Sequence, residues 1–454
     1  MDEDEFDVGP SLSDDSDMEI QPQHTMVVKE DKYRRENRRL RNSLSFRVGT
    51  LLTNSFRKPW MLPLLPLTLA KLGWSYVNER LGRRPLPYPD RSLDDAEAKE
   101  PLRDCIVLFP TNGVGFGHFT RMYALAKRLR MQSPSTEIVF FTTMPTLQIL
   151  YNEDFSTYHL AGRKKHREMT ASEWNAMVEE NLSLVLNQHK PKMFIFDGAF
   201  PYRGMLNAIR SRDRIEKVWV RRGMFRKGSN IPVDSIEHFT SIVRPGDSVD
   251  VDEHLKVEIS VQSHSVSPML LMNHDEVLTK EQASGRLNLP DGSKIVYVQL
   301  GAGRINDIDS EIRLTVDALL NHENVHVVIG ESMLGDRIYF QHPRVQLLRD
   351  YPNSMYFRAF DASIQAGGYN SFHEMRTFGL PTLFYPNMNT GMDDQLARCK
   401  IAQKEGWGLV LEERTKASIA RSVETLLGLK VPDEHPQSTN GADELATLLL
   451  EKIR

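Results

Sequence analysis

The sequence predicts an α/β protein with two domains of similar size, each built on a mostly parallel β-sheet with helices on both faces. Three observations lead to this prediction. From about residue 104 onward, short apolar runs alternate with amphipathic stretches. The pattern restarts near residue 290. A chain of 454 residues is also long for a single domain.

The first predicted domain covers residues 104 to 284. Its first apolar run, at residues 105 to 110, predicts a buried strand, and a glycine-rich turn then leads into a helix that begins near His118. Further strands are predicted at residues 137–143, 192–198 and 217–223. In such a sheet, ligand contacts are expected at the carboxyl ends of the strands.

The second predicted domain covers residues 285 to 430, and we expect residues 431 to 454 to form a C-terminal helix or tail. Its strands are predicted at 294–303, 325–330, 345–348, 382–386 and 408–412, with an apolar segment at 355–368 and helices at 370–379 and 393–406.

The N-terminal extension changes character twice. Residues 1–30 are rich in Asp, Glu and Ser and predict a disordered acidic tail. Residues 31–81 combine Lys and Arg with Trp, Leu and Tyr, which suits a segment in the headgroup region of an anionic membrane; packing on the protein body or on a second subunit is the alternative. Pro63 and Pro66 interrupt the apolar run, so it is not expected to cross a bilayer. Residues 82–103 predict a linker.

Charge and cysteine content narrow the functional class. A net charge of −4 without a basic domain argues against nucleic-acid binding. Cys105 and Cys399 lie far apart, so neither a disulfide framework nor a CxxC metal site is expected, and a cytoplasmic location fits. No secretory signal is visible at the acidic N-terminus. We interpret the acidic residues between positions 247 and 253 as a solvated loop rather than a metal site.

The first motif places Gly113, Gly115 and Gly117 directly before His118. The glycines alternate as GxGxG, unlike the GxGxxG of dinucleotide-binding domains. A glycine-rich turn that opens a helix directs backbone N–H groups at a ligand. His118 is therefore a candidate general base or substrate contact, with a helix-capping role as the alternative.

Two further strand ends carry candidate residues. Asp197 ends a predicted strand and is a second candidate base, or a group that orients His118. Arg221 and Arg222 end another strand and suit an anionic acceptor, or alternatively surface ion pairs.

The second predicted domain carries two more motifs. Gly301, Gly303 and Arg304 follow its first strand and can offer N–H groups and a positive charge to a diphosphate. Residues 366–386 are more informative, because a Gly367–Gly368 turn precedes a helix that has Asn370 or Ser371 as its predicted N-cap.

Glu374 lies one turn inside that helix and allows two interpretations. It either bonds back to the backbone in a capping box, or accepts hydrogen bonds from ribose hydroxyls while the helix N-terminus faces a diphosphate. After the next strand, Asp393, Asp394 and Gln395 follow Asn387 and Asn389 in a polar segment that suits sugar hydroxyls.

Residues 366–408 resemble the donor-binding signature of glycosyltransferase family 28 and the UDP-glycosyltransferases, particularly the peptidoglycan N-acetylglucosaminyltransferase-like members. The resemblance spans about residues 104–425 and implies the GT-B architecture, with two Rossmann-like doubly wound parallel-sheet domains and a cleft between them. It also implies a UDP-sugar as co-substrate, no other cofactor, no metal, and inversion at the anomeric carbon. His373 and Tyr369 are not typical of the family, and Asp394 stands where relatives often carry Gln or Arg.

By this resemblance Glu374 holds the ribose, the glycines meet the diphosphate, and Asp394 and Gln395 hold the sugar. His118 then lies near the acceptor or the transferred sugar. The full set of predicted donor contacts is Gly301, Gly303, Arg304, Gly367, Gly368, Asn370, Ser371, Glu374, Asp393, Asp394 and Gln395. The predicted acceptor-side residues are Gly115, Gly117, Arg221 and Arg222.

The expected function is transfer of a hexose or N-acetylhexosamine from a UDP-sugar to a lipid-linked or cell-surface polysaccharide acceptor. The acceptor hydroxyl attacks the anomeric carbon, and the leaving diphosphate is stabilised by backbone amides and a helix dipole. We expect the enzyme at the inner face of the cell membrane, attached peripherally through residues 31–80. A UDP-sugar 2-epimerase and a non-catalytic GT-B binding protein are the alternatives.

Overall fold

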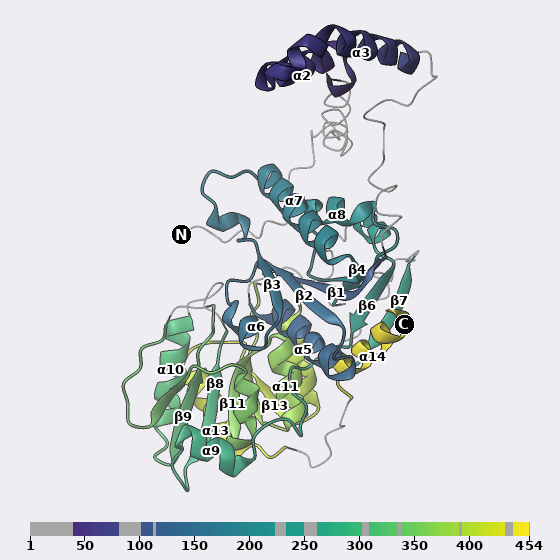
Figure 1. The fold of residues 1–454 in the computed structure, drawn as a ribbon. Helices are drawn as coiled ribbons and strands as arrows, with labels where there is room; N and C mark the ends of the chain where they lie inside the picture. The colour runs from purple at the N-terminus through teal and green to yellow at the C-terminus, as the bar shows by residue number, and fades with distance from the viewer. Residues whose placement is uncertain are drawn as a thin grey trace, which may run out of the picture. The chain divides into compact units, whose positions relative to one another are not determined.

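The computed structural model describes residues 40–80, 101–111, 115–222, 233–248, 261–301, 308–334, 337–389, 393–431 and 439–453. They belong to two compact units, one within Glu5–Glu100 and one from Pro101 onward (Figure 1). The predicted acidic tail and most of the predicted linker lie outside the described residues.

The larger unit contains two parallel sheets, as predicted. The N-terminal sheet has seven strands in the order β3-β2-β1-β4-β5-β6-β7. Their bounds are β1 Arg103–Pro110, β2 Glu137–Thr142, β3 Ser156–His159, β4 Pro191–Asp197, β5 Glu216–Val220, β6 Ser241–Pro245 and β7 Gln262–Val266. Parallel pairing places all of their carboxyl ends at one edge of the sheet.

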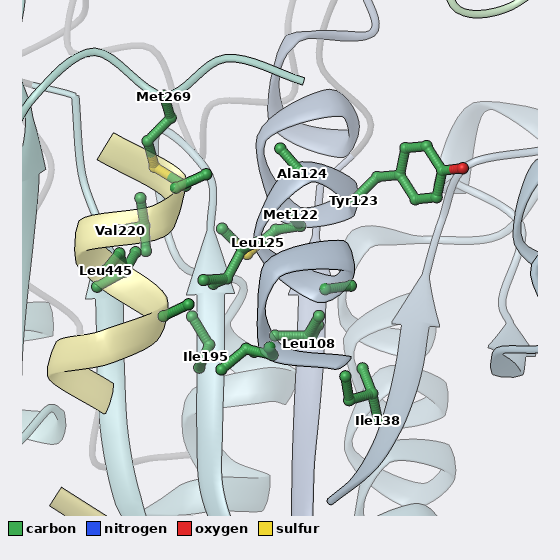
Figure 2. Packing of buried hydrophobic residues seen from close by; sticks show 14 of the residues in the cluster. Leu108, Met122, Tyr123, Ala124, Leu125, Ile138, Ile195, Val220, Met269 and Leu445 are labelled. Atoms are coloured by element: carbon green, nitrogen blue, oxygen red, sulfur yellow. The ribbon is translucent and has the colours of Figure 1, made fainter. Parts of the chain in front are cut away.

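Strand β1 shows how this sheet divides two cores. Successive side chains of a strand point to opposite faces, so Ile106 and Leu108 belong to one buried cluster and Val107 and Phe109 to the other. Helices α5 (Gly117–Gln132) and α14 (Gly441–Ile453) cover the first face; α7 (Ala171–His189) and α8 (Arg203–Arg210) cover the second. Figure 2 shows side chains of α5 and α14 packed over the central strands.

Strands β3, β6 and β7 were not predicted. Their sequences, STYH, SIVRP and QSHSV, are short and mix polar with apolar residues, so they lack the continuous apolar run that marks a central strand. Pairing makes them strands: β3 pairs with β2, β6 with β5, and β7 with β6.

The C-terminal sheet has six strands in the order β10-β9-β8-β11-β12-β13. Their bounds are β8 Lys294–Gln299, β9 Val325–Gly330, β10 Val345–Leu348, β11 Ala362–Ala366, β12 Thr382–Tyr385 and β13 Gly408–Val410. The predicted apolar segment at 355–368 divides into a 3₁₀ helix, η5 (Asn353–Ala359), and β11.

Helices cover both faces of this second sheet as well. Side chains of α10 (Ile308–Leu320) and α13 (Lys416–Gly428) pack on one face. Side chains of α9 (Lys280–Leu287), η5, α11 (Tyr369–Phe378) and α12 (Gln395–Lys404) pack on the other. The remaining short elements are α6 Gln148–Asn152, η2 Arg163–Lys165 and η3 Val233–His238.

The chain crosses between the two sheets twice. Helix α9 contributes Ala283 and Leu287 to the C-terminal core, so the predicted boundary at residues 284 and 285 falls inside that helix. At the other end of the chain, α14 contributes Leu445 and Leu449 to the N-terminal core. The predicted C-terminal helix therefore packs against the first sheet.

The smaller unit is helical. It contains α2 (Leu44–Arg57), the 3₁₀ helix η1 (Pro59–Leu64) and α3 (Leu65–Arg80), and α2 contacts α3. Arg47 of α2 donates hydrogen bonds of 2.6 and 3.1 Å to Glu79 of α3. Large apolar side chains are exposed on it, including Phe56 at 72% and Trp60 at 71%. No helix in the described part of the chain is long and apolar enough to cross a membrane.

Candidate active site

The carboxyl ends of the N-terminal sheet carry a hydrogen-bonded trio. Asp197 is the last residue of β4 and is fully buried. His118 lies in the first turn of α5, and its Nδ1 is 2.7 Å from Asp197 Oδ1. Arg121, one turn further along α5, donates to both Asp197 oxygens at 2.9 and 2.8 Å. Asp197 was predicted as a second candidate base or as a group that orients His118, and its contact with Nδ1 is the one that the orienting role requires.

The protonation states of this trio follow from its surroundings. Burial, together with the positive charges of Arg121 and Arg222, lowers the pKa of His118 although Asp197 opposes this. Burial would raise the pKa of Asp197, but Arg121 and His118 outweigh it and the pKa of Asp197 is lowered. His118 Nδ1 lies between Asp197, which can only accept, and Arg121 Nη2, which can only donate and is 2.9 Å away. We assign the proton of the neutral ring to Nδ1, where it is donated to the closer Asp197 oxygen, so that Nε2 is the acceptor.

Helix α11 begins at the carboxyl end of β11, in the C-terminal half. Its N-cap is Gly368, with no side-chain cap, and the helix starts at Tyr369. The prediction that Asn370 or Ser371 caps the helix is therefore wrong, because both lie in the first turn. The first N–H groups of a helix have no partner within it. With no capping side chain at Gly368, these groups can bind an anion.

Gly367 is required by close packing at the same turn. A Cβ at this position would lie 2.5 Å from Cys399 Sγ and 3.2 Å from Gln395 Cβ. The turn therefore fits tightly against α12.

Glu374 lies one turn into α11 and has no hydrogen-bond or ion-pair partner among the described residues. Burial raises its pKa to about 8. Because a capping box would bond this carboxyl to the helix start, the capping interpretation of Glu374 does not hold. A half-buried, unpaired carboxyl is instead suited to a ligand's hydroxyl groups.

Two tyrosines lie near enough to Glu374 for its charge to raise their pKa values, after the larger effect of burial. Tyr297 Oη accepts a hydrogen bond from Asn353 Nδ2 at 2.8 Å. Asn353 Oδ1 is buried without a hydrogen-bond partner. Tyr351 Oη is 3.1 Å from Thr120 Oγ1 of α5. Glu374 is thus surrounded by polar groups that were not predicted.

Arg398 of α12 links the two halves of the larger unit and is fully buried. Its guanidinium donates to Asp247, which follows β6, at 3.0 and 2.8 Å, and to Asp393 at 2.6 Å. It also donates to the carbonyl of Gly367 at 2.9 Å. The prediction of a solvated acidic loop is therefore wrong for Asp247, whose side chain is 4% exposed. The rest of that segment, from residue 249, lies outside the described residues.

Asp247 has a second partner in the C-terminal half. His373 Nε2 of α11 is 3.2 Å from Asp247 Oδ1. Burial would raise the pKa of Asp247, but His373 and Arg398 together hold it well below its usual range. Asp247 is accordingly ionised in the folded protein.

Tyr369, the first residue of α11, lies among arginines from both halves. Its ring centroid is 5.5 Å from Arg121, 5.4 Å from Arg222 and 5.9 Å from Arg398. Its hydroxyl donates to the carbonyl of Gly246 at 2.8 Å. Each of these arginines also pairs with a carboxylate, so the start of α11 lies in a network of ion pairs that includes Asp197, Asp247 and Asp393.

The polar residues after β12 have internal partners. Asp393 accepts from Arg398 and lies 3.4 Å from Arg222. Asp394 caps α12 by accepting from Ala397 N at 3.0 Å, and Gln395 Oε1 accepts from Asn387 N at 2.9 Å. Asp393, Asp394 and Gln395 therefore stabilise the fold itself, in addition to the sugar-binding roles predicted for them.

The two arginines predicted on the acceptor side, Arg221 and Arg222, have different surroundings. Arg222 contacts the donor-side residues Asp393 and Tyr369. Arg221 is buried over the ring of Trp219 at 4.9 Å, and burial, with Arg244, lowers its pKa to about 10. The interpretation of both as surface residues is wrong.

The glycine-rich turns are described only in part. Gly117 is the first residue of α5, and Gly115 lies two residues before it. Gly301 follows β8 with φ of +99°, in the left-handed region that favours glycine. Gly113, Gly303 and Arg304 lie outside the described residues.

Several residues of the site were missed in the sequence: Arg121, Asp247, Tyr297, Asn353, Tyr351 and Arg398. Helical spacing signals one of them, because Arg121 follows His118 by three positions and so shares its face. The others depend on contacts between distant segments.

A separate cavity of about 550 Å³ lies at the amino ends of the C-terminal strands, lined by residues such as Lys280, Lys294 and Asp361. It contains none of the predicted site residues and lies at the sheet edge opposite to α11. The candidate active site is therefore the one at the carboxyl ends.

Comparison with solved structures supports the architecture. The glycotransferase of kitacinnamycin matches with a TM-score of 0.53 and 14% identity, over 78% of this chain and 100% of its own. This chain has the GT-B fold. CalG4, the calicheamicin glycosyltransferase, matches with a TM-score of 0.50 and 16% identity, over 78% and 94% of the two chains.

The same fold also occurs with another activity. The UDP-GlcNAc 2-epimerase from Methanocaldococcus jannaschii matches with a TM-score of 0.51 and 12% identity, over 76% of this chain and 99% of its own. No family model matches the sequence, and no curated protein is significantly similar to it. The likeness establishes the GT-B fold and leaves the reaction to be argued from the site.

Proposed function

We propose that the protein is an inverting glycosyltransferase that moves a hexose or N-acetylhexosamine from a UDP-sugar to a lipid-linked or cell-surface polysaccharide acceptor. One observation carries the proposal. The His118–Asp197 pair lies opposite the uncapped start of α11, and Arg121 joins them by bonding Asp197 and approaching the Tyr369 ring to 5.5 Å. Arg121 thus contacts both the proposed base pair and the helix start that we propose to bind the diphosphate.

On the donor side, the N–H groups at the start of α11 bind the diphosphate, with Gly367 and Gly368 permitting close approach. Glu374 binds the ribose hydroxyls. A carboxyl with a pKa of about 8 is mostly protonated at neutral pH, so it both donates and accepts hydrogen bonds. Gly301, Gly303 and Arg304 complete the diphosphate contacts in this proposal. Asp393, Asp394 and Gln395 remain the proposed contacts of the transferred sugar.

On the acceptor side, His118 Nε2 takes the proton of the attacking hydroxyl. Asp197 accepts from Nδ1–H and stabilises the imidazolium that forms. The hydroxyl oxygen bonds to the anomeric carbon as the bond to the diphosphate breaks, and a single displacement inverts that carbon. The helix end and the nearby arginines stabilise the charge that develops on the diphosphate, so the proposed step needs no metal.

We propose that the helical unit attaches the enzyme to the inner face of the cell membrane. Residues 40–80 contain six basic residues and one acidic residue. Exposed apolar side chains accompany them, including Phe56, Trp60, Leu67 and Trp74. This combination fits a surface of anionic lipid. Deleting residues 1–80 should abolish co-flotation with anionic liposomes; equal flotation without them would contradict the attachment.

A UDP-sugar 2-epimerase is the second candidate. It needs several acid and base groups around the hexose, and the cleft offers His118, Asp197, His373 and Glu374. The two reactions differ in their requirement for an acceptor. An epimerase converts the UDP-sugar alone and keeps UDP attached, whereas a glycosyltransferase releases UDP and depends on an acceptor.

The decisive experiment incubates the purified protein with a panel of UDP-sugars, with and without a lipid-linked acceptor. Calorimetry measures donor binding, UDP release measures transfer, and NMR detects a changed sugar epimer. Acceptor-dependent UDP release supports the proposal. Epimer formation without an acceptor supports the second candidate, and the lack of any UDP or UDP-sugar binding removes both.

A further inference from the structure

Three side chains of different chemistry converge at the amino end of the N-terminal sheet, opposite to the cleft. They are Cys105 of β1, Glu137 of β2 and His189 of α7, and one possible ligand atom from each lies within 4.8 Å of the others. We propose that these residues bind a divalent transition-metal ion, with zinc as the best match. This inference does not depend on the proposed function.

The backbone holds the three residues in place. Cys105 and Glu137 are register partners in neighbouring parallel strands, so their side chains lie side by side on one face of the sheet. His189 is the last residue of α7, and the next residue, Lys190, accepts a hydrogen bond from Arg103 N at 2.8 Å. Since both strands and the helix end are fixed, metal binding requires only small side-chain movements.

The histidine is already oriented by a second partner. His189 Nδ1 lies 2.9 Å from Glu137 Oε1, and its Nε2 lies 2.8 Å from Tyr158 Oη. With the metal on Nδ1, the ring proton moves to Nε2 and is donated to the oxygen of Tyr158. A ligating histidine usually has such an outer hydrogen bond, which fixes its tautomer and ring orientation.

Charge and burial favour a transition metal. Cys105 is fully buried, and its thiol is the sulfur ligand of the proposed site. Coordination releases that single thiol proton to solvent. The resulting thiolate and carboxylate together balance a 2+ ion. Sulfur, nitrogen and oxygen ligands suit zinc, whereas magnesium and calcium prefer oxygen alone.

Solvent reaches the proposed metal site next to Glu137. The Glu137 side chain is 30% exposed, while His189 is 7% exposed. A water molecule entering there completes four-coordination. Arg103 lies 3.3 Å from Glu137 Oε2, so Oε1 is the ligand oxygen. Because the site is at the amino ends of the strands, its ion would stabilise the N-terminal sheet rather than join the reaction.

The test uses the full-length protein, reduced and stripped of metal with a chelator, and then titrated with Co²⁺. Thiolate coordination of Co²⁺ gives a charge-transfer absorption in the near ultraviolet. We expect one Co²⁺ per chain and displacement by Zn²⁺. The chain contains only Cys105 and Cys399, so Cys399→Ser is the matched control and should keep the absorption. Cys105→Ser should lose it, and His189→Gln should weaken Co²⁺ binding at least tenfold.

A second measurement covers the case in which a variant fails to fold. Zn²⁺ should raise the thermal unfolding midpoint of the wild-type protein in a concentration-dependent way, because it binds the folded state preferentially. Absence of both the absorption and the midpoint shift in the wild type shows that the three residues form a hydrogen-bonded cluster only, and overturns the proposal. Retention of the absorption in Cys105→Ser would do the same.

Discussion

Replacing Arg398 with methionine should remove a large part of the stability that joins the two halves of the GT-B unit. Arg398 is fully buried and pairs with Asp247 and Asp393. The methionine preserves an apolar stem but leaves two carboxylates without their main partner. Removing one member of a buried ion pair typically costs about 3–5 kcal/mol, so we expect a loss of this size in the free energy of unfolding.

The assay is urea unfolding of a double-mutant cycle made of wild type, Arg398→Met, Asp247→Asn and the double variant. Because Arg398 and Asp247 share two hydrogen bonds, their coupling should be about 2–3 kcal/mol. The matched control is Arg376→Met, which removes the 2.8 Å pair with Glu405, where both side chains are about one-third exposed. That pair should contribute at most about 1 kcal/mol.

Acid should reduce the difference between Arg398→Met and wild type. The folded-state pKa of Asp247 lies below its ordinary 3.8. The contribution of ionised Asp247 to the free energy of unfolding is therefore complete above pH 3.8, and it is lost as the pH falls further toward the folded-state pKa. A coupling near zero, or a cost no larger than that of Arg376→Met, would refute the role assigned to Arg398.

The remaining predictions concern the cleft. His118→Ala should lower kcat about 10²–10⁴-fold with donor affinity unchanged; unaltered turnover in the UDP-release assay would exclude it as the base. Glu374 titrates near pH 8 when folded instead of 4.5, so the folded state binds more protons, and unfolding free energy should fall as pH rises through that window. Glu374→Gln should flatten this dependence in urea titrations and weaken UDP binding in calorimetry. Gly367→Ala should cost about 1–3 kcal/mol by overpacking against Cys399; failure of Cys399→Ala to restore stability would contradict that explanation.

The two-sheet architecture was predictable from hydrophobic patterning alone. The central strands can be recognised in the sequence because a strand covered by helices on both faces is almost entirely apolar, as CIVLFP and VHVVIG are. Strands β6 and β7 were not predicted because their composition is mixed; they are strands because β6 pairs with β5 and β7 pairs with β6. The local sequence pattern reveals strands that are apolar on both faces and reveals little about strands of mixed composition.

The sequence also located the main parts of the candidate site. His118, Asp197 and Glu374 each follow a strand end or begin a helix, and parallel strands bring such positions to one edge. Their partners could not be found in this way. Asp247 and Arg398 are 151 positions apart and meet only when the two halves pack.

The role of each polar group, in contrast, follows from tertiary contacts. Asp393 looks like a sugar contact in sequence, yet it accepts from Arg398 beside Arg222. Asp247 looks solvated, yet it is a buried ion. Cys105, Glu137 and His189 carry no spacing motif, because sheet register and a helix end bring them together. Residue type and spacing are local properties, whereas burial, pairing and charge depend on which distant segments meet.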